Sequence, residues 1–297
     1  MNVDLHCHST NSDGTWSVSQ ILKEAERKGV DILAITDHDN FRGSIEAHQL
    51  APNYFTGKLV AGIEISTRIM NKSLHFLAYF PTFDLDPKSE LLLNLEKIRN
   101  SRVWRMKEMI KKTIEMGFDI TYEDVMEEVI TGTDGSQQPS DVISRPHLAR
   151  VLVKKGYADS FEEAFDKYVA DGKVLYVSRF TLKFEHWIKQ VHDLGGILVW
   201  AHPFEGYHDN FDEFVKFAEY VTRFPIDGIE RVYNYKGKYR ISEDFEKRGN
   251  RYLDKVIAEK KFIITAGGDF HGNVGFLGEL ELPEANSIHF LNQLRSN

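Results

Sequence analysis

Histidines and carboxylates occur in this sequence in short pairs that could hold metal ions. His6 and His8 are separated by one residue, and so are Asp269 and His271. In a β-strand such residues point to the same side of the chain, so each pair can present two donor atoms to one ion. Imidazole and carboxylate groups suit divalent Zn, Mn, Fe or Ni, and Cys7 is the single thiol. The pairs therefore predict metal-assisted chemistry.

Further residues of this kind follow the other expected strands. Strands are predicted at 31–36, 58–65, 73–80, 197–201, 227–233 and 262–267, after a short first strand that ends near Leu5, and most are followed by helical patterns. This alternation predicts an α/β fold with a largely parallel sheet, and in a barrel of that kind the active site forms at the carboxyl ends of the strands. The residues expected there are His6, His8, Asp13, Asp37, His38, Glu64, His75, His202, Glu230, Asp269 and His271. They are too many for one ion, so two or three ions with a shared carboxylate are expected.

A helical segment interrupts the α/β pattern between the fourth and fifth strands. Helices are predicted at 88–117, 122–129, 146–155 and 161–171, with a loop at 131–140. We expect residues 1–87 and 181–297 to form one discontinuous barrel and residues 88–180 to form an insertion that covers the active site. The Lys and Arg residues of the first helix in this insertion are expected on its solvated face.

Composition excludes several classes of protein. The 297 residues are 42% hydrophobic and 28% charged, as in soluble globular enzymes. The net charge of −8 argues against broad nucleic-acid binding, which needs an excess of Lys and Arg. A lone cysteine indicates a reducing compartment, and no secretory leader or apolar run of membrane-spanning length is present. These features predict a cytoplasmic protein with no membrane contact and no obligatory protein partner.

Six segments together resemble the polymerase and histidinol phosphatase (PHP) family of phosphoesterases. They are DLHCHSTNSDG (4–14), TDHD (36–39), GIEIS (62–66), LHFLAYF (74–80), AHP (201–203) and GGDFHG (267–272). The resemblance implies a distorted (β/α)7 barrel with a trinuclear metal centre. It implies a first metal held by His6, His8, Glu64 and Asp269, a second held by Glu64, His75 and His202, and a third held by Asp13, His38 and His271.

The insertion contains ISRPHLARVL (143–152), which resembles a segment of the nucleotide-directed branch of that family. That branch includes AMP phosphatases and 3′,5′-nucleotide bisphosphate phosphatases. The resemblance implies that Arg145 and His147 contact the phosphate. The planar guanidinium group of an arginine matches the geometry of phosphate oxygens. The alternative is a plain helix start with Pro146 in its first position.

Two positions depart from the family pattern. Gly268 stands where Ser or Ala is usual, which is compatible with a backbone role but not with a hydroxyl contact. Arg231 follows Glu230 where an apolar residue is usual, so Arg231 either contacts phosphate or faces outward. Whether Glu230 supports the site stays open at this point.

The predicted reaction is hydrolysis of the 5′-phosphate of small nucleotides by a metal-activated hydroxide. Expected substrates are AMP or 3′,5′-nucleotide bisphosphates, extending to short oligonucleotides through 5′–3′ exonuclease activity. The expected cofactors are two or three Mn²⁺ ions, with Fe, Zn or Mg as alternatives. Asp37 is a candidate catalytic residue that either orients its neighbour His38, accepts a proton or caps the end of the strand. Protonation of the leaving oxygen is expected either from His147 or from an acidic group on the side of His202. The alternative functions are a histidinol-phosphate-type or other small-molecule phosphatase and a non-catalytic PHP module; the complete ligand set argues against the last.

Overall fold

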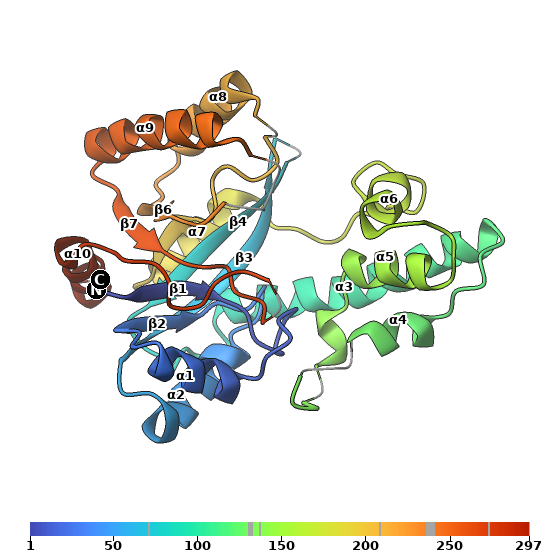
Figure 1. The fold of residues 1–297 in the computed structure, drawn as a ribbon, viewed down its shortest axis with the longest axis horizontal. Helices are drawn as coiled ribbons and strands as arrows, with labels where there is room; N and C mark the ends of the chain where they lie inside the picture. Colours follow the sequence, from blue (N-terminus) through green and yellow to red (C-terminus); the bar gives the residue numbers. More distant parts are fainter. Residues whose placement is uncertain are drawn as a thin grey trace.

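A single sheet, nearly closed into a barrel, forms the centre of the molecule (Figure 1). The computed structural model describes residues 1–70, 72–129, 133–136, 138–207, 209–235, 241–272 and 274–296. Within these residues the seven strands follow the order of the sequence: β1 (Val3–Cys7), β2 (Ile32–Ile35), β3 (Lys58–Ile69), β4 (Lys72–Phe80), β5 (Ile197–Trp200), β6 (Gly228–Val232) and β7 (Ile263–Ala266). A parallel bridge between Cys7 and Phe270 joins the first strand to the segment after the last. The distorted α/β barrel expected from the sequence is therefore confirmed.

Strand β4 runs against its neighbours. It is antiparallel to both β3 and β5, whereas the other neighbouring strands are parallel. In the β3–β4 hairpin Ser66 pairs with His75, and Glu64 lies two residues before Ser66. His75 thus lies in the first half of its strand, and its placement among residues expected at the carboxyl ends of parallel strands is wrong. The reversal of direction nevertheless brings His75 to the same end of the barrel as Glu64.

Helices surround this sheet. They are α1 (Val18–Arg27), α2 (Arg42–Tyr54), α7 (Phe184–Asp193), α8 (Phe211–Val221), α9 (Glu243–Lys260) and α10 (Glu284–Ser296). Helix α1 begins with a capping box, in which the side chains of Ser17 and Gln20 each bond the backbone N–H of the other residue. Helix α10 was not expected; its Phe290 packs edge-on against Tyr79 of β4. Among the described residues, no helix is both long and apolar enough to cross a membrane.

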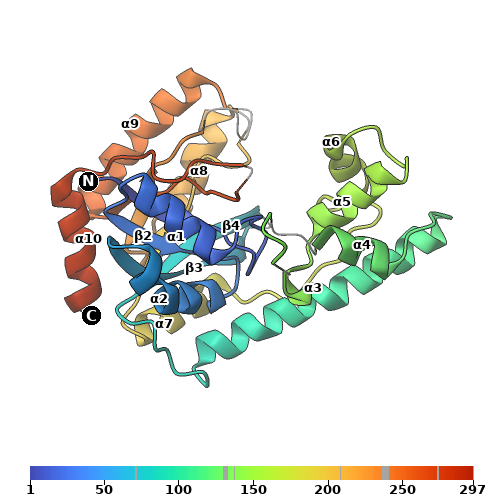
Figure 2. The same cartoon turned by 60° about the horizontal axis from the view of Figure 1, so that its bottom comes forward.

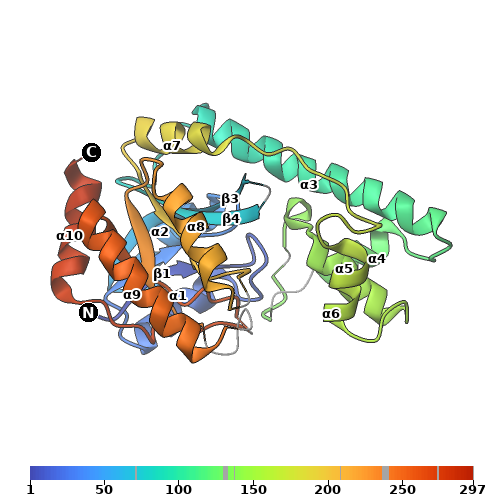
Figure 3. The same cartoon turned by 90° about the horizontal axis from the view of Figure 1, so that it is seen from above.

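The remaining helices lie to one side of the barrel (Figures 2 and 3). They are α3 (Glu90–Glu115), α4 (Tyr122–Val129), α5 (Arg145–Lys154) and α6 (Phe161–Ala164), with a 3-10 turn at Ser140–Val142 and a π turn at Phe165–Val169. Of the loop expected at 131–140, residues 131, 132 and 137 lie outside the described residues, and 133–136 contain no helix or strand.

The long helix α3 links the two parts of the structure. Its first half packs Leu91, Leu95 and Ile98 into the core of the barrel. Its second half packs Met106 and Met109 into a separate core shared with α4–α6. Because one helix contributes to both cores, the insertion is held firmly against the barrel. A domain boundary at residue 88 stays a prediction.

Candidate metal centre

Glu64 lies at the centre of a buried cluster of histidines. Its side chain on β3 is completely buried. Five histidine nitrogens lie 2.8–3.3 Å from its two carboxylate oxygens: His6 Nε2 (3.3 Å), His75 Nδ1 (3.2 Å) and His202 Nε2 (3.2 Å) beside Oε1, and His8 Nε2 (3.2 Å) and His38 Nδ1 (2.8 Å) beside Oε2. One carboxylate is thus shared by histidines from four other segments of the chain.

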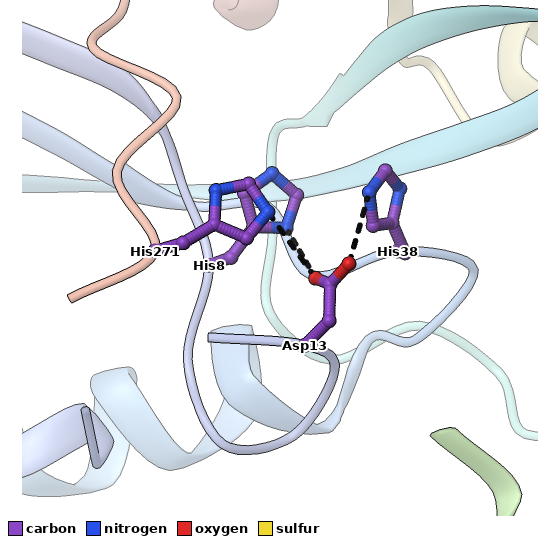
Figure 4. Close-up of side chains that lie close together, drawn as sticks. All are labelled: His8, Asp13, His38 and His271. Atoms are coloured by element: carbon purple, nitrogen blue, oxygen red, sulfur yellow. Dashed lines mark ion pairs between the residues drawn. The ribbon is translucent and has the colours of Figure 1, made fainter. Parts of the chain in front are cut away.

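A second carboxylate, Asp13, gathers histidines from the loops that follow β1, β2 and β7 (Figure 4). Its Oδ1 lies 3.3 Å from His271 Nε2, and its Oδ2 lies 3.8 Å from His38 Nε2. The rings of His8 and His271 stack with their centroids 4.1 Å apart. Residues near the two ends of the sequence therefore meet in one place.

The third carboxylate, Asp269, divides its two oxygens between different partners. Oδ1 lies 3.5 Å from His6 Nε2 and 3.3 Å from His8 Nε2. The Tyr233 hydroxyl donates a hydrogen bond of 2.8 Å to Oδ2, which fixes the orientation of the carboxylate. Asp269 has a φ of 49° and His202 a φ of 26°, left-handed values that are unfavourable outside glycine. Such strain is typical of functional positions held by their surroundings.

The structure brings all nine predicted ligand residues together, and their geometry fits metal ions. Five buried atoms aimed into the cluster have no hydrogen-bond partner among the described residues: His6 Nε2, His8 Nε2, His38 Nδ1, Glu64 Oε2 and Asp13 Oδ1. Two ligands that each lie about 2.1 Å from one ion in a tetrahedral arrangement are roughly 3.4 Å apart. The distances of 2.8–3.8 Å in this cluster match that spacing.

The charges of the cluster also favour cations. Burial by itself lowers the pKa of a histidine, yet the neighbouring carboxylates of Asp269 and Glu64 raise the pKa of His8 to about 10. Burial likewise raises the pKa of a carboxyl group, yet His38, His75 and His6 hold the pKa of Glu64 well below its usual range. The buried carboxylates thus require positive charge among the imidazoles. Divalent ions meet that requirement while the ring nitrogens stay unprotonated and free to coordinate.

Two glutamates orient the histidines from outside the cluster. Glu230 lies 3.0 Å from His6 Nδ1, and its other oxygen accepts the backbone N–H of His202 at 2.8 Å. Glu205 lies 3.0 Å from His202 Nδ1. A carboxylate at one ring nitrogen fixes the tautomer and leaves the other nitrogen as the ligand. Glu230 therefore supports the site, and Glu205, which sequence reasoning missed, could have been noticed three residues after His202.

Arg231 takes no part in this arrangement. Strand alternation turns its side chain away from the cluster, and its Nε lies 2.7 Å from Asp254 Oδ1 on α9. Of the two interpretations left open by the sequence, the structure supports the outward-facing one.

Asp37 fixes the loop that carries the predicted ligands His8 and Asp13. Its buried carboxylate accepts hydrogen bonds from the Ser9 backbone N–H (2.7 Å), the Ser9 hydroxyl (2.8 Å) and the Ser12 hydroxyl (2.6 Å). With both oxygens engaged in this way, the geometry favours a positioning role over that of a proton acceptor.

A second buried aspartate, Asp4, was missed by sequence reasoning. Its carboxylate accepts backbone N–H groups of His6, Gly268 and Gly278 at 3.3, 3.1 and 2.9 Å, and burial raises its pKa to about 6. It ties the first strand to the loop that carries Asp269. A Cβ atom at Gly268 would lie 1.5 Å from the Phe276 carbonyl oxygen, so this position has a backbone role and admits no side chain.

A cavity of about 630 Å³ lies between the barrel and the insertion. Asp13, His38 and His75 of the cluster contribute to its wall, and so do five arginines: Arg68, Arg102, Arg105, Arg145 and Arg179. Sequence reasoning had identified only Arg145 among them. Arg102 and Arg105 belong to helix α3, whose basic residues were expected on the solvated face. That expectation is wrong for Arg105, which is only 6% exposed, because α3 packs between the two cores.

Arg145 and His147 both lie in the first turn of helix α5, but their environments differ. Arg145 lines the cavity and pairs with Asp171. His147 is buried, is not among the residues that line the cavity, and its Nδ1 accepts the Ser144 backbone N–H at 2.9 Å. Burial lowers the pKa of His147 to about 4. The helix begins at Arg145, so Pro146 occupies its second position rather than the first.

Comparisons with known proteins agree with this geometry. A 5′–3′ exoribonuclease of Haemophilus influenzae is 33% identical over 203 residues, which are 67% of this chain and 68% of that protein. A 3′,5′-nucleoside bisphosphate phosphatase of Chromobacterium violaceum is 30% identical over 203 residues, 68% of this chain and 67% of that protein. A solved structure from Bifidobacterium adolescentis, assigned as a metal-dependent phosphoesterase, superposes with a TM-score of 0.75 at 26% identity, covering 98% of this chain and 95% of that one. The PHP domain itself matches residues 4–263. The chain therefore belongs to the PHP domain family and is a phosphoesterase of that family.

Proposed function

We propose that this protein removes the 5′-phosphate from small nucleotides, with AMP and 3′,5′-nucleoside bisphosphates as the substrate class. The observation that carries the proposal is that the histidine–carboxylate cluster and a set of arginines share one cavity. A cavity of about 630 Å³ falls within the range of roughly 300–1,000 Å³ that is typical of small-molecule sites. The exoribonuclease and bisphosphate phosphatase relatives both act on nucleotide phosphates.

We assign the ligands to three ions in the way that the family resemblance implies. His6, His8, Glu64 and Asp269 would hold the first ion, Glu64, His75 and His202 the second, and Asp13, His38 and His271 the third. When bound, Mn²⁺ or another divalent ion supplies a Lewis acid for the phosphoryl oxygens and lowers the pKa of water towards about 7. Six histidines with three carboxylates are a donor set that Mn, Fe or Zn accepts.

The protein's own groups bind and orient the substrate. Arg145 has its guanidinium in the cavity and can present two N–H groups to phosphate oxygens. Because His147 Nδ1 accepts the Ser144 N–H, its neutral ring carries a proton on Nε2. The family resemblance implies a hydrogen bond from His147 to phosphate, but this buried side chain does not line the cavity. The low pKa of His147 also argues against a role as an imidazolium acid at neutral pH.

Aromatic rings beside Arg145 favour a substrate with a base. The guanidinium carbon of Arg145 lies 5.4 Å from the centre of the Phe165 ring and 5.7 Å from that of Tyr176, and both rings line the cavity. Nucleobases stack on such rings irrespective of sequence. This feature favours a nucleotide over histidinol phosphate, the alternative substrate.

A substrate panel tests the proposal. The Mn²⁺-loaded protein is incubated with AMP, adenosine 3′,5′-bisphosphate and histidinol phosphate, and inorganic phosphate is measured. We expect phosphate from the two nucleotides and little from histidinol phosphate. The variant Glu64→Gln serves as the inactive control, and Lys111→Gln, an exposed change on α3, as the active one. Turnover of histidinol phosphate alone would overturn the assignment.

A further inference from the structure

Asp39 is a completely buried carboxylate that follows the predicted ligand His38 and is not itself one of the clustered donors. Its Oδ1 accepts the backbone N–H of Ser66 at 2.8 Å, and its Oδ2 pairs with Arg102 and lies 3.7 Å from Arg179 Nη1. These partners belong to β3, to α3 and to the segment before α7. One aspartate thus ties a strand that carries predicted metal ligands to the arginine-lined wall of the cavity.

The backbone of Asp39 is bent into the left-handed region. Its φ is 51°, a value that a residue with a side chain adopts at a cost unless its surroundings hold it there. The Asp39 N–H donates to the Glu64 carbonyl oxygen at 2.8 Å, and the Asp39 carbonyl oxygen accepts an Nη1–H group of Arg99 at 2.8 Å. Together with the pairs of the carboxylate, these two hydrogen bonds hold the bend directly after His38.

The ring of His38 depends on this backbone more than the ring of His6 does. Its Nδ1 lies 2.8 Å from Glu64 Oε2, and its Nε2 lies 3.8 Å from Asp13 Oδ2 (Figure 4). Within the part of the chain that the structure describes, no other carboxylate lies within 4.0 Å of either nitrogen. By contrast, Glu230 fixes the ring of His6 from outside the cluster. We therefore expect the position of the His38 ring to follow the backbone that carries it.

His38 is assigned to the third ion together with Asp13 and His271, and this ion would lie at the more open edge of the cluster. The side chains of Asp13 and His271 are 31% and 20% exposed, whereas that of Glu64 is completely buried. Packing thus fixes the ligands of the third ion less firmly than Glu64. The affinity of this ion should depend strongly on how well the backbone of His38 is held.

We propose that Asp39 is a positioning residue for the third ion, because it fastens the backbone of His38 to Arg102 and Arg179 in the cavity wall. The inference rests on the proposed function, which includes the assignment of the third ion. Its consequence is that a change in the cavity wall, at a residue that is no ligand, alters how firmly one of the three ions is bound.

The Mn²⁺ affinity of Asp39→Asn tests this role. Asparagine has the same shape and keeps an oxygen for the Ser66 N–H, but it removes the charge that Arg102 and Arg179 share. Metal-free protein is titrated with Mn²⁺ by calorimetry, and the bound Mn per chain is measured by atomic absorption. We expect one ion to bind roughly 10–100-fold more weakly and the other two to bind as in the wild type. Retention of those two ions also shows that the variant is folded.

Asp171→Asn is the matched control. Asp171 pairs with Arg68 and Arg145 in the same cavity wall, so this variant removes an equal charge without disturbing the backbone next to a predicted ligand. We expect its Mn²⁺ affinities to equal those of the wild type. Equal weakening in the two asparagine variants would overturn the inference, because the charge of the wall alone would then explain the effect.

Arg102→Gln separates positioning from electrostatics by the sign of its effect. Removing a positive charge beside the cluster should by itself strengthen the binding of a cation. If Arg102 serves to hold Asp39, the same substitution should weaken the binding of one ion. We expect the weaker binding, and an Mn²⁺ affinity that is unchanged or higher would overturn the inference.

These titrations need no turnover, so they separate the inference from the proposed function. A wild-type chain that binds fewer than three ions would refute the role of Asp39, and so would Asp39→Asn protein that binds three ions as tightly as the wild type. Failure of the fully loaded wild type to release phosphate from any nucleotide would refute the proposed function alone.

Discussion

Replacing Glu230 by glutamine should weaken metal binding although Glu230 itself is no ligand. Its carboxylate accepts two hydrogen bonds, from His6 Nδ1 at 3.0 Å and from the His202 backbone N–H at 2.8 Å. A glutamine has one acceptor oxygen, so its amide N–H group must face one of these two donors. One charge-assisted hydrogen bond is then lost, at a cost of about 1.5–3 kcal/mol.

This free-energy cost corresponds to a weaker affinity for the metal ion. Since about 1.4 kcal/mol corresponds to a factor of ten, Glu230→Gln should bind Mn²⁺ roughly 10–100-fold more weakly. The assay is calorimetric titration of metal-free protein with Mn²⁺ at pH 7.5. Arg231→Gln is the matched control, because the adjacent side chain pairs with Asp254 on the outer side of the same strand. Equal Mn²⁺ affinity in Glu230→Gln and wild type, with both folded by circular dichroism, would refute this account of how His6 is oriented.

Three further substitutions test other parts of the structure. Asp37→Ala should lower the free energy of unfolding by about 3 kcal/mol in urea, because it leaves three buried donors on Ser9 and Ser12 without an acceptor; wild-type stability would contradict this. Gly268→Ala should lower the unfolding free energy by about 1–3 kcal/mol, since the new methyl group would lie 1.5 Å from a carbonyl oxygen, and an unchanged melting temperature would argue against so close an approach. The third substitution, His147→Gln, tests the dependence of stability on pH. The pKa of His147 is about 4 in the folded protein and 6.5 in the unfolded chain. As the pH falls from 6.5 to 4 the unfolded chain therefore binds a proton before the folded protein does, and the free energy of unfolding decreases. From pH 7 to pH 5 the wild type should therefore lose about 2 kcal/mol more than His147→Gln in urea titrations, and equal losses would show that His147 is not buried as a neutral ring.

The clustering of the candidate ligand residues was predictable because their signals are local. His6 and His8, like Asp269 and His271, stand two residues apart. Nearly every expected strand also contains, or is directly followed by, a His, Asp or Glu residue. The barrel was predictable for a similar reason, since alternating strands and helices restrict how a sheet can close.

The supporting residues were not predictable because they depend on contacts distant in sequence. His6 and Glu230 are 224 residues apart, and only the closed sheet brings them together. Arg105 is buried because α3 packs against two separate cores. The sequence of α3 by itself indicates only an amphipathic, charged helix. The sequence left the role of Glu230 open, and the geometry identifies it as a positioning residue.

The dependence of phosphate release on bound metal tests the central claim most directly. Metal-free protein is titrated with Mn²⁺, the bound metal per chain is measured, and phosphate released from AMP and from adenosine 3′,5′-bisphosphate is followed at each step. The account predicts no turnover without metal and a rise to a plateau when two to three ions are bound per chain. It would be contradicted by a fully loaded protein that releases no phosphate from either nucleotide, or by turnover that is the same with and without metal.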